Sequence, residues 1–508
     1  MISLKEWVKA HPLGAVLAAA IAVRLLAVIW SQGFIHSDDH FETVSVAWDW
    51  LTSGLSGDDG FLTWKHKGAE TITRFPLYTL FLFGQMKLCQ WLGIDTLGAM
   101  MYVIRFVHAL LSLVPVWAAF QIARTVTGSV RWAVAAGLVM SFHFALPFLG
   151  MRNLIEVVGG GIWLAALVYL YRYHDDKRIF WLNVAGTLTG LAWMIRFQIA
   201  FAVLPVPLLL WWREQHIRPA AHYSGAVVAT ILLSGLADWW LLGGFARSTF
   251  TGLARNFGLQ AHYHTIPLLY FVMLVLLLVP PISLVMPFLA FRRRFVREQA
   301  LLVWSSVSFV VFHTLHPLQQ ERYVFPIVPA VIVMGILAVW HYLNRDRQTA
   351  LLPQWLKLTA WASLAVNMAL LFFFTFAYGH KGMIEPLRWL QDTAPDARVM
   401  FVQPEVKRWV PMEYGGKSLR PVYVREWESL RQWSPSQAGE PEFDYFVIYP
   451  KTDTRLPAYL DSLEIRFGPL ELVEQIPPSY YDRTLHLLNP GHNDDFAAYV
   501  YCPAGGHQ

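Results

Sequence analysis

The sequence predicts an all-α polytopic membrane protein, with about 11–13 transmembrane helices, followed by a C-terminal soluble α/β domain. Of the 508 residues, 56% are hydrophobic and only 15% are charged, whereas soluble domains carry about 25% charged residues. Apolar runs of about 20 residues, long enough to cross a bilayer as helices, recur through most of the chain. After Tyr378 the composition changes to polar residues mixed with short β-like runs.

The first apolar run covers residues 13–30 and follows Lys5 and Lys9. We expect an uncleaved first span with a cytoplasmic N-terminus, because no small-residue cleavage site follows the run. Arg24 lies within this span, so we expect it either to snorkel to the interface or to be buried against other helices.

Basic clusters indicate the orientation of the later spans, because Lys and Arg are enriched in cytoplasmic loops. The clusters lie at residues 171–178, 212–218, 292–297 and 345–347. The net charge of +5 is therefore attributed to this rule, and nucleic-acid binding is not expected. Spans are expected near residues 154–171, 180–195, 199–212, 222–243, 267–290, 299–315, 323–342 and 356–378.

Residues 76–150 hold three apolar runs, although alternation between the two sides of the membrane requires an even number of crossings. One run must therefore be re-entrant or split in two. The runs cover residues 76–94, 98–121 and 131–150.

The C-terminal part divides at residue 380, which gives a transmembrane domain at 1–379 and a soluble extracytoplasmic domain at 380–508. Strands are expected at 398–402, 445–449 and 497–501, and helices at 385–392 and 458–467. The two cysteines, Cys89 and Cys502, provide neither a metal spacing nor a disulfide framework.

A crowded acidic stretch, His36-Ser37-Asp38-Asp39-His40-Phe41-Glu42, directly follows the first span. Acids are costly near a membrane and near one another, so this stretch is a candidate catalytic carboxylate site, and a solvated acidic loop is the alternative. In an extended segment Asp38 and Asp39 would point to opposite sides, so one can act as a base while the other contacts a structural partner. A divalent metal is not required, but Glu42, Asp58 or Asp59 would supply further oxygen ligands for one.

Four more polar regions fall on the same outer side, at residues 152–156, 196–198, 244–266 and 313–322. In the last of these, Arg322 with His316 at a bilayer edge suits a phosphate or pyrophosphate, and lipid headgroups are the alternative. The patterns GxGxxG and GxxxxGK[ST] are absent, in accord with an enzyme that uses no cytoplasmic nucleotide.

Polar residues at other span ends are further cavity candidates: Arg152, Asn153, Glu156, Arg196 and Gln198. An i, i+4 pair between Arg152 and Glu156 is the structural alternative for two of them. Asp238 lies within an apolar run and would either pair with Arg247 or line a sugar-binding cavity. Weaker candidates for the same cavity are Arg247, Asn256, His262, Tyr263 and His264.

Together these stretches resemble the GPI- and dolichol-pathway mannosyltransferases, glycosyltransferase family 22 of the GT-C superfamily. The family's early His-Pro-Asp-Glu-type motif resembles residues 36–42, its Arg…Asn…Glu stretch resembles 152–156, and its His-Lys-Glu-x-Arg-Phe-x-x-Pro motif resembles 316–326. The resemblance covers roughly residues 10–345. Ser37 replaces the proline, Asp39 replaces the glutamate, and the late motif is longer and lacks the lysine, which suggests a bacterial relative.

The resemblance implies a GT-C-like fold and an inverting transferase with little or no dependence on a metal. The donor would be a polyprenyl-phosphate hexose, with mannose favoured, and the acceptor a lipid-linked glycan. Asp38 would be the base, Asp39 would position it, and Arg322 with His316 would hold the donor phosphate. The substrate cavity would be lined by His36, His40, Glu42, Arg152, Asn153, Glu156, Arg196, Gln198, Asp238 and Glu321.

The expected location is the bacterial inner membrane, among membrane lipids, with the site and the C-terminal domain facing the periplasm. A lipid or glycan transporter, or flippase, with an outer soluble domain is the alternative. Such a transporter would show two related halves with Gly- or Pro-broken helices and charges at mid-bilayer. The polar groups of this chain instead crowd one face, which favours surface chemistry.

Overall fold

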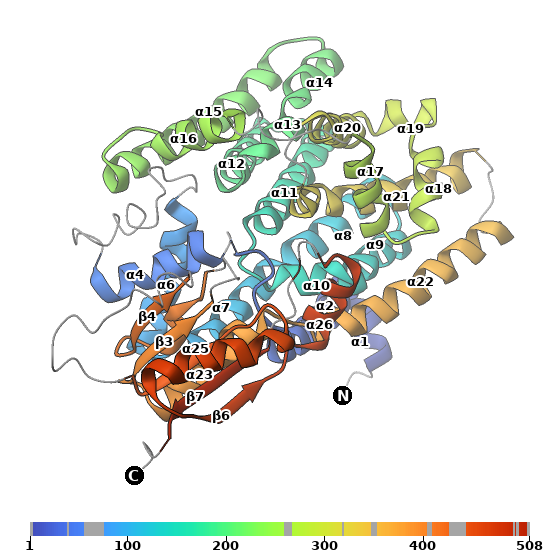
Figure 1. The fold of residues 1–508 in the computed structure, drawn as a ribbon. Helices are drawn as coiled ribbons and strands as arrows, with labels where there is room; N and C mark the ends of the chain where they lie inside the picture. The colour runs from blue at the N-terminus through green and yellow to red at the C-terminus, as the bar shows by residue number, and fades with distance from the viewer. Residues whose placement is uncertain are drawn as a thin grey trace. The chain divides into compact units, whose positions relative to one another are not determined.

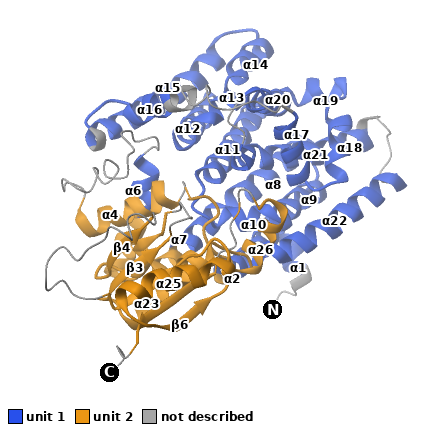
Figure 2. Cartoon of the chain, viewed as in Figure 1, with its two compact units in different colours: residues 1–28, 61–82, 104–375 blue, residues 29–60, 83–103, 376–508 orange. Residues whose placement is uncertain are grey.

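The computed structural model describes residues 4–37, 40–54, 76–258, 267–316, 320–346, 353–403, 409–425, 443–490, 493 and 497–504. They form two compact units (Figure 2). The first unit contains residues 1–28, 61–82 and 104–375. The second contains residues 29–60, 83–103 and 376–508, so the segment that follows the first span belongs to the same unit as the C-terminal region.

The described residues contain six helices that are long and apolar enough to cross a membrane, or up to seven if a pair bent by 110° is one span (Figure 1). The six are Pro12–Trp30 (α2), Leu97–Thr127, Ile155–Asp176 (α11), Arg218–Trp240, Glu321–Asn344 and Gln354–Thr375 (α22). The second comprises Leu97–Leu111 (α7) and Leu113–Thr127 (α8), and the fourth lies within Arg218–Leu242 (α15). The fifth comprises Glu321–Ile327 (η4), Val328–His341 (α21) and part of Tyr342–Asp346 (η5). The bent pair is Leu268–Leu277 with Ile282–Ala290 (α17 and α18), and shorter apolar helices are Val130–Phe142 (α9), Ile179–Ile195 (α12) and Ala300–Leu315 (α20). The polytopic helical class is confirmed.

Several predicted spans are built from shorter pieces, so fewer helices pass the length criterion than the predicted number of spans. The expected span at 199–212 consists of Phe197–Ile199 (η2), Ala200–Val203 (α13) and Pro205–Glu214 (α14), with a break before a proline that lacks an N–H donor. The run at 131–150 divides into α9 and Ala145–Gly150 (α10). Other helices outside the C-terminal region are Leu4–Ala10 (α1), Pro76–Trp91 (α6), Arg247–Gly258 (α16) and Arg293–Glu298 (α19).

Close helix packing in the first unit depends on small residues, as is common in membrane bundles. A Cβ atom on Gly186 of α12 would lie 2.4 Å from the backbone oxygen of Tyr223 in α15, so a larger residue would not fit there.

Arg24 of α2 is buried, and its Nε donates to Ser112 Oγ at 2.6 Å. Of the two expectations for Arg24, burial against other helices is confirmed.

The second unit contains a five-stranded sheet in the order β4-β3-β5-β7-β6. Strand β3 is parallel to both β4 and β5, whereas β7 is antiparallel to β5 and β6. Helix α25 packs against one face, where Tyr459 and Leu463 join Met400 in the core. Helix α23 packs on the other face, where the Trp389 ring lies 5.5 Å from that of Tyr445. The predicted α/β character is confirmed.

The strands are Arg398–Val402 (β3), Arg420–Val424 (β4), Tyr445–Ile448 (β5), Leu470–Ile476 (β6) and Ala498–Pro503 (β7). The helices are Lys381–Thr393 (α23), Met412–Gly415 (η6), Asp453–Arg455 (η7), Leu456–Phe467 (α25) and Tyr480–Leu488 (α26). The three predicted strands and two predicted helices are present. Strands β4 and β6 were missed, because one contains a proline and the other carries charged residues along a largely exposed strand.

The second unit also includes the segment around the acidic stretch. Gln32–Gly33 (β1) pairs in parallel with Tyr378–Gly379 (β2). Gly33 has φ +72°, and a Cβ there would lie 1.8 Å from the Gly379 oxygen, so this approach requires glycine. Next come His40–Val44 (η1) and Ser45–Ser53 (α4).

Candidate active site

The two aspartates predicted to be catalytic, Asp38 and Asp39, lie outside the described residues, as do Asp58 and Asp59. In the part of the chain that is described, no group of three or more His, Cys, Asp or Glu side chains is placed to hold a metal. The metal alternative therefore rests on aspartates that the structure does not describe. The weaker loop candidates His262, Tyr263 and His264 and the side chain of Asn256 also lie outside it.

An ion pair joins two predicted site residues of the first unit, Glu156 and Arg196. Glu156 is in the first turn of α11, Arg196 follows the end of α12, and Arg196 Nη2 lies 3.0 Å from Glu156 Oε1. The i, i+4 alternative assumed one helix through Arg152, but α11 begins only at Ile155 and its N-cap Leu154 is extended. Glu156 therefore pairs with a residue that lies 40 positions away in sequence.

The ring of Tyr323 connects Arg196 to the late arginine, Arg322. The guanidinium carbon of Arg196 lies 4.9 Å from the ring centroid and that of Arg322 lies 5.4 Å from it. Both distances are within the range of a cation–π contact. Tyr270 Oη donates to the Tyr323 carbonyl at 3.1 Å and helps to hold the 3-10 helix η4 (Glu321–Ile327). Tyr323 belongs to the 316–326 stretch singled out in the sequence, but no role in the site was predicted for it.

Two consecutive glycines on α11 allow these elements to meet. A Cβ on Gly160 would lie 2.5 Å from the backbone oxygen of Pro326 in η4. A Cβ on Gly159 would lie 2.9 Å from the Ile199 side chain and 3.3 Å from Cβ of Arg196. Because atoms do not approach so closely without a shift, the absence of side chains here lets the η2 and η4 segments reach α11.

The other predicted residues at these span ends differ in exposure. Arg152, Asn153, Gln198 and Arg322 are buried, His316 is half-buried and Glu321 is exposed. The guanidinium of Arg152 lies over the Phe148 ring at 4.9 Å. Among the described residues, three arginines and one glutamate are thus buried just after α10 and α12 and at the starts of η4 and α11. Such an excess of buried positive charge suits an anionic ligand.

His40, which directly follows the two aspartates, meets a residue of the C-terminal region. Its Nε2 lies 2.8 Å from Glu413 Oε1, and Ser45 Oγ donates to the same oxygen. Burial raises the pKa of Glu413, but the hydrogen bond and charge of His40 and the hydrogen bond of Ser45 bring it below the ordinary value of 4.5. Glu413 was missed, because no local pattern marks it. His36 and Glu42 are half-buried.

Asp238 has a structural partner within the first unit. Its Oδ2 accepts from the Ser248 backbone N–H at 2.9 Å and from Ser248 Oγ at 2.6 Å, at the first turn of α16. This contact satisfies an N–H group that a helix start leaves without an intrahelical partner. A structural pair was one of the two alternatives for Asp238, and Arg247 was its expected partner. The contact found is instead with Ser248, the next residue.

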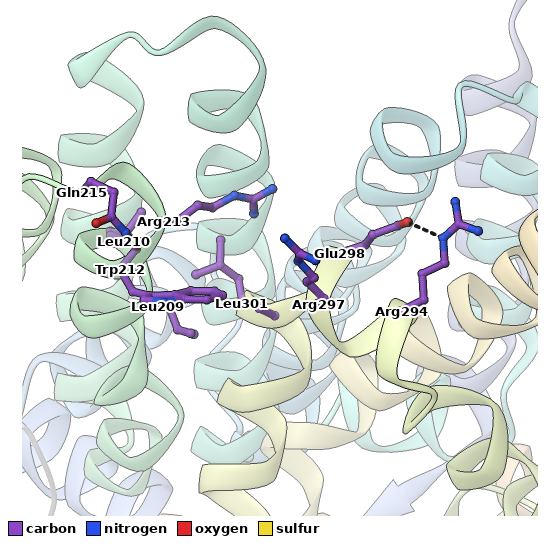
Figure 3. Close-up of a pocket in the computed structure, with 10 residues that line it drawn as sticks. Leu209, Leu210, Trp212, Arg213, Gln215, Arg294, Arg297, Glu298 and Leu301 are labelled. Carbon is purple, nitrogen blue, oxygen red and sulfur yellow. Dashed lines mark hydrogen bonds and ion pairs between the residues drawn. The ribbon is translucent and has the colours of Figure 1, made fainter.

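An open pocket of about 560 Å³ lies between α14 and α19–α20 (Figure 3). Arg294 Nε donates to Glu298 Oε1 at 3.1 Å, and Arg213 contacts His174 Nε2 at 2.5 Å. His174 is 18 residues after Glu156 on α11, or about 27 Å along the helix at 1.5 Å per residue. The pocket is therefore at the opposite end of the bundle from the buried arginines and is not part of their site.

Comparison with known proteins identifies the family. No curated protein matches the chain in sequence. The crystal structure of ArnT from Cupriavidus metallidurans bound to undecaprenyl phosphate is similar, with a TM-score of 0.62, 14% identity and coverage of 99% of both chains. The apo structure of the same ArnT gives a TM-score of 0.62 and 14% identity over 97% of this chain and 98% of that one. At this identity the likeness shows the fold, which is that of the GT-C enzymes.

The Alg9-like mannosyltransferase family matches residues 15–405, which is most of the chain. This range includes the stretches at 36–42, 152–156 and 316–326 on which the resemblance rests. The protein therefore belongs to the Alg9-like mannosyltransferase family, glycosyltransferase family 22 of the GT-C superfamily, and is an integral multi-pass membrane glycosyltransferase.

Proposed function

We propose that the enzyme transfers mannose from polyprenyl-phosphate mannose to a lipid-linked glycan, with inversion, at the periplasmic face of a bacterial inner membrane. One observation carries this proposal: Arg196 and Arg322 converge on the Tyr323 ring, beside Glu156. This arrangement provides buried positive charge at the end of the bundle opposite the basic pocket. The undecaprenyl phosphate bound to the ArnT neighbour supports a lipid phosphate as the donor class.

The buried arginines would act on the leaving group. As the sugar–phosphate bond breaks, negative charge grows on the phosphate, and a guanidinium in a dry site stabilises that charge more than it would in water. We assign phosphate binding to Arg322, assisted by His316. Arg196, held by Glu156 and Tyr323, adds positive charge without needing to reorganise during the reaction.

The acceptor hydroxyl would be activated by Asp38. The oxygen of the acceptor hydroxyl attacks the anomeric carbon of the donor sugar from the side opposite the phosphate. The bond from that carbon to the phosphate oxygen breaks, and the hydroxyl proton moves to the Asp38 carboxylate. A single displacement of this kind inverts the anomeric configuration. Asp39 would position the base. The residues proposed to line the sugar cavity are His36, His40, Glu42, Arg152, Asn153, Gln198, Asp238 and Glu321.

The outer-face assignment rests on the positive-inside rule. Arg213, Arg294 and Arg297 lie at one end of the first unit, whereas Glu156 and its arginines lie at the other end of α11. Basic loops face the cytoplasm in most membrane proteins, which supports a periplasmic location for the buried arginines.

The test is transfer of radiolabel from polyprenyl-phosphate mannose in membranes that contain the wild type or the Asp38→Asn, Arg322→Gln or Arg294→Gln variant. We expect Asp38→Asn and Arg322→Gln to lower transfer by at least about 100-fold, while the control Arg294→Gln stays near wild type. Equal transfer in wild type and Asp38→Asn would place the base at Asp39 or Glu42. No transfer in any sample would refute mannose as the donated sugar, and other lipid-phosphate hexoses would then be compared.

A further inference from the structure

The segment just before Asp38 and Asp39 in the sequence contacts the C-terminal region. In the second unit, Gln32 and Gly33 pair with Tyr378 and Gly379 as parallel strands. Ser31 Oγ also donates to the Ala377 carbonyl at 3.0 Å. These contacts hold residues 31–33, which precede Asp38 by only a few positions in the sequence.

A row of four stacked rings forms a second contact between this segment and the C-terminal region. The Phe34 ring lies between the rings of His380 and His40, with centroids 4.3 Å and 4.7 Å away and interplanar angles of 18° and 15°. His40 also stacks on Tyr414, at 5.7 Å and 13°. Two rings come from the segment that carries the aspartates and two from the C-terminal region, so the row links them on both sides of the pair.

The segment that follows Asp39 in the sequence is held by the carboxylate of Glu413. Glu413 Oε1 receives hydrogen bonds from His40 Nε2 and from Ser45 Oγ, and the Glu413 side chain is only 8% exposed. Ser45 is the first residue of α4, so Glu413 fixes both the π-helical turn at 40–44 and the helix that follows. Hydrogen bonds to an ionised acceptor are stronger than neutral ones, and a pKa below the ordinary value keeps Glu413 ionised at neutral pH.

We propose that Glu413 is a positioning residue for the transfer reaction: it holds His40 and Ser45, which follow Asp38 and Asp39 in the chain. The inference rests on the proposed function, since it takes Asp38 as the base. It gives the C-terminal region a specific task, which is to form the scaffold of the catalytic segment. Glu413 itself contacts no reacting atom in this scheme.

The test compares the full-length wild type with Glu413→Ala, Glu413→Gln and Asp453→Asn. The last is a matched control, because Asp453 accepts a hydrogen bond from Tyr499 Oη at 2.9 Å in the same unit but contacts no residue of the catalytic segment among those described. Two readouts are needed: kcat and the donor KM for mannose transfer, and hydrogen–deuterium exchange of residues 40–53. Thermal unfolding reports whether each variant is folded.

We expect Glu413→Ala to lower kcat by about 10- to 100-fold while the donor KM changes by less than about threefold, because the base is displaced but the phosphate site is intact. Exchange should rise in residues 40–53 and stay unchanged in α11. Glu413→Gln should recover part of kcat, since its amide oxygen still accepts both hydrogen bonds without the charge. Asp453→Asn should match the wild type in both readouts.

Unchanged kcat and unchanged exchange in folded Glu413→Ala would overturn the proposal. So would a rise in donor KM at constant kcat, which would instead assign Glu413 to substrate binding. If the wild type itself transfers no mannose, the proposed function fails, and the exchange of residues 40–53 alone decides whether Glu413 holds the segment.

Discussion

The Arg196 Nη2 atom lies 3.0 Å from the Glu156 Oε1 atom, and the two side chains are only 8% and 0% exposed. Loss of one partner of a buried ion pair leaves the other charge without compensation in a low-dielectric environment, at a cost of about 3–5 kcal/mol. We therefore expect Glu156→Gln to lower the unfolding free energy by about this amount and to reduce transfer. Thermal or denaturant unfolding in detergent measures the first effect.

The double variant Glu156→Gln/Arg196→Gln measures the coupling energy between the two side chains. It should be less destabilised than the sum of the two single variants, because neither charge then remains alone. Arg294→Gln is the matched control, since its pair with Glu298 is exposed and contributes at most about 0.5 kcal/mol. Strict additivity of the two single effects would show that the contact carries no coupling energy.

The glycine contact between α11 and η4 leads to a second prediction. In Gly160→Ala the new methyl carbon would lie 2.5 Å from the Pro326 oxygen, a backbone atom that cannot rotate away. We expect a loss of about 1–3 kcal/mol in stability and a larger loss of transfer, because η4 carries Arg322. Gly225→Ala on α15 is the control, since a Cβ there meets nothing within 4 Å. Equal behaviour of the two variants would contradict the close approach.

The parts of the fold that depend on local composition could be predicted from the sequence. Apolar runs of bilayer length predicted the helices, and alternating β-branched and aromatic residues predicted β3, β5 and β7. Breaks within helices were harder to place, because they depend on single residues such as Pro205. Strand β4 was missed for a similar reason, since it contains Pro421 and pairs only at the sheet edge.

The sequence identified several individual residues of the site but not which of them contact one another. Polar side chains at span ends identified Glu156, Arg196 and Arg322, because such groups are costly in a membrane unless they have a function. Their pairing depends on how helices pack, so the nearest arginine in sequence was considered for Glu156 instead of Arg196. Glu413 lies 373 residues from His40, and no spacing rule connects residues so far apart.

The lowered pKa of Glu413 leads to a third prediction, on acid stability. A carboxylate with a pKa below its unfolded value stabilises the fold above that value, and the contribution is lost as the pH falls through the folded pKa. The stability difference between wild type and Glu413→Gln should therefore be constant at neutral pH and shrink below pH 4.5. Unfolding midpoints across this range measure the difference.

The imidazole that faces Glu413 provides the control for this pH effect. In a His40→Asn background the hydrogen bond and charge that lower the pKa of Glu413 are removed, while burial, which raises it, remains. Because the folded pKa then lies closer to the unfolded value or above it, the stability difference should fall less on acidification than with His40 present, or rise instead. An unchanged pH dependence would show that His40 does not determine the ionisation of Glu413.

A fourth prediction concerns Asp238, for which two roles were considered. As the acceptor for the Ser248 N–H and hydroxyl groups, it stabilises the start of α16, and such a contact contributes about 0.5–2 kcal/mol. If this is its whole role, Asp238→Ala and Ser248→Ala should be destabilised by similar amounts and keep their kcat and donor KM. If Asp238 also contacts the sugar, Asp238→Ala should raise KM or lower kcat while Ser248→Ala does not. Unfolding and transfer kinetics of the two variants, measured side by side, separate these outcomes because Ser248 shares the helix contact and is not among the proposed cavity residues.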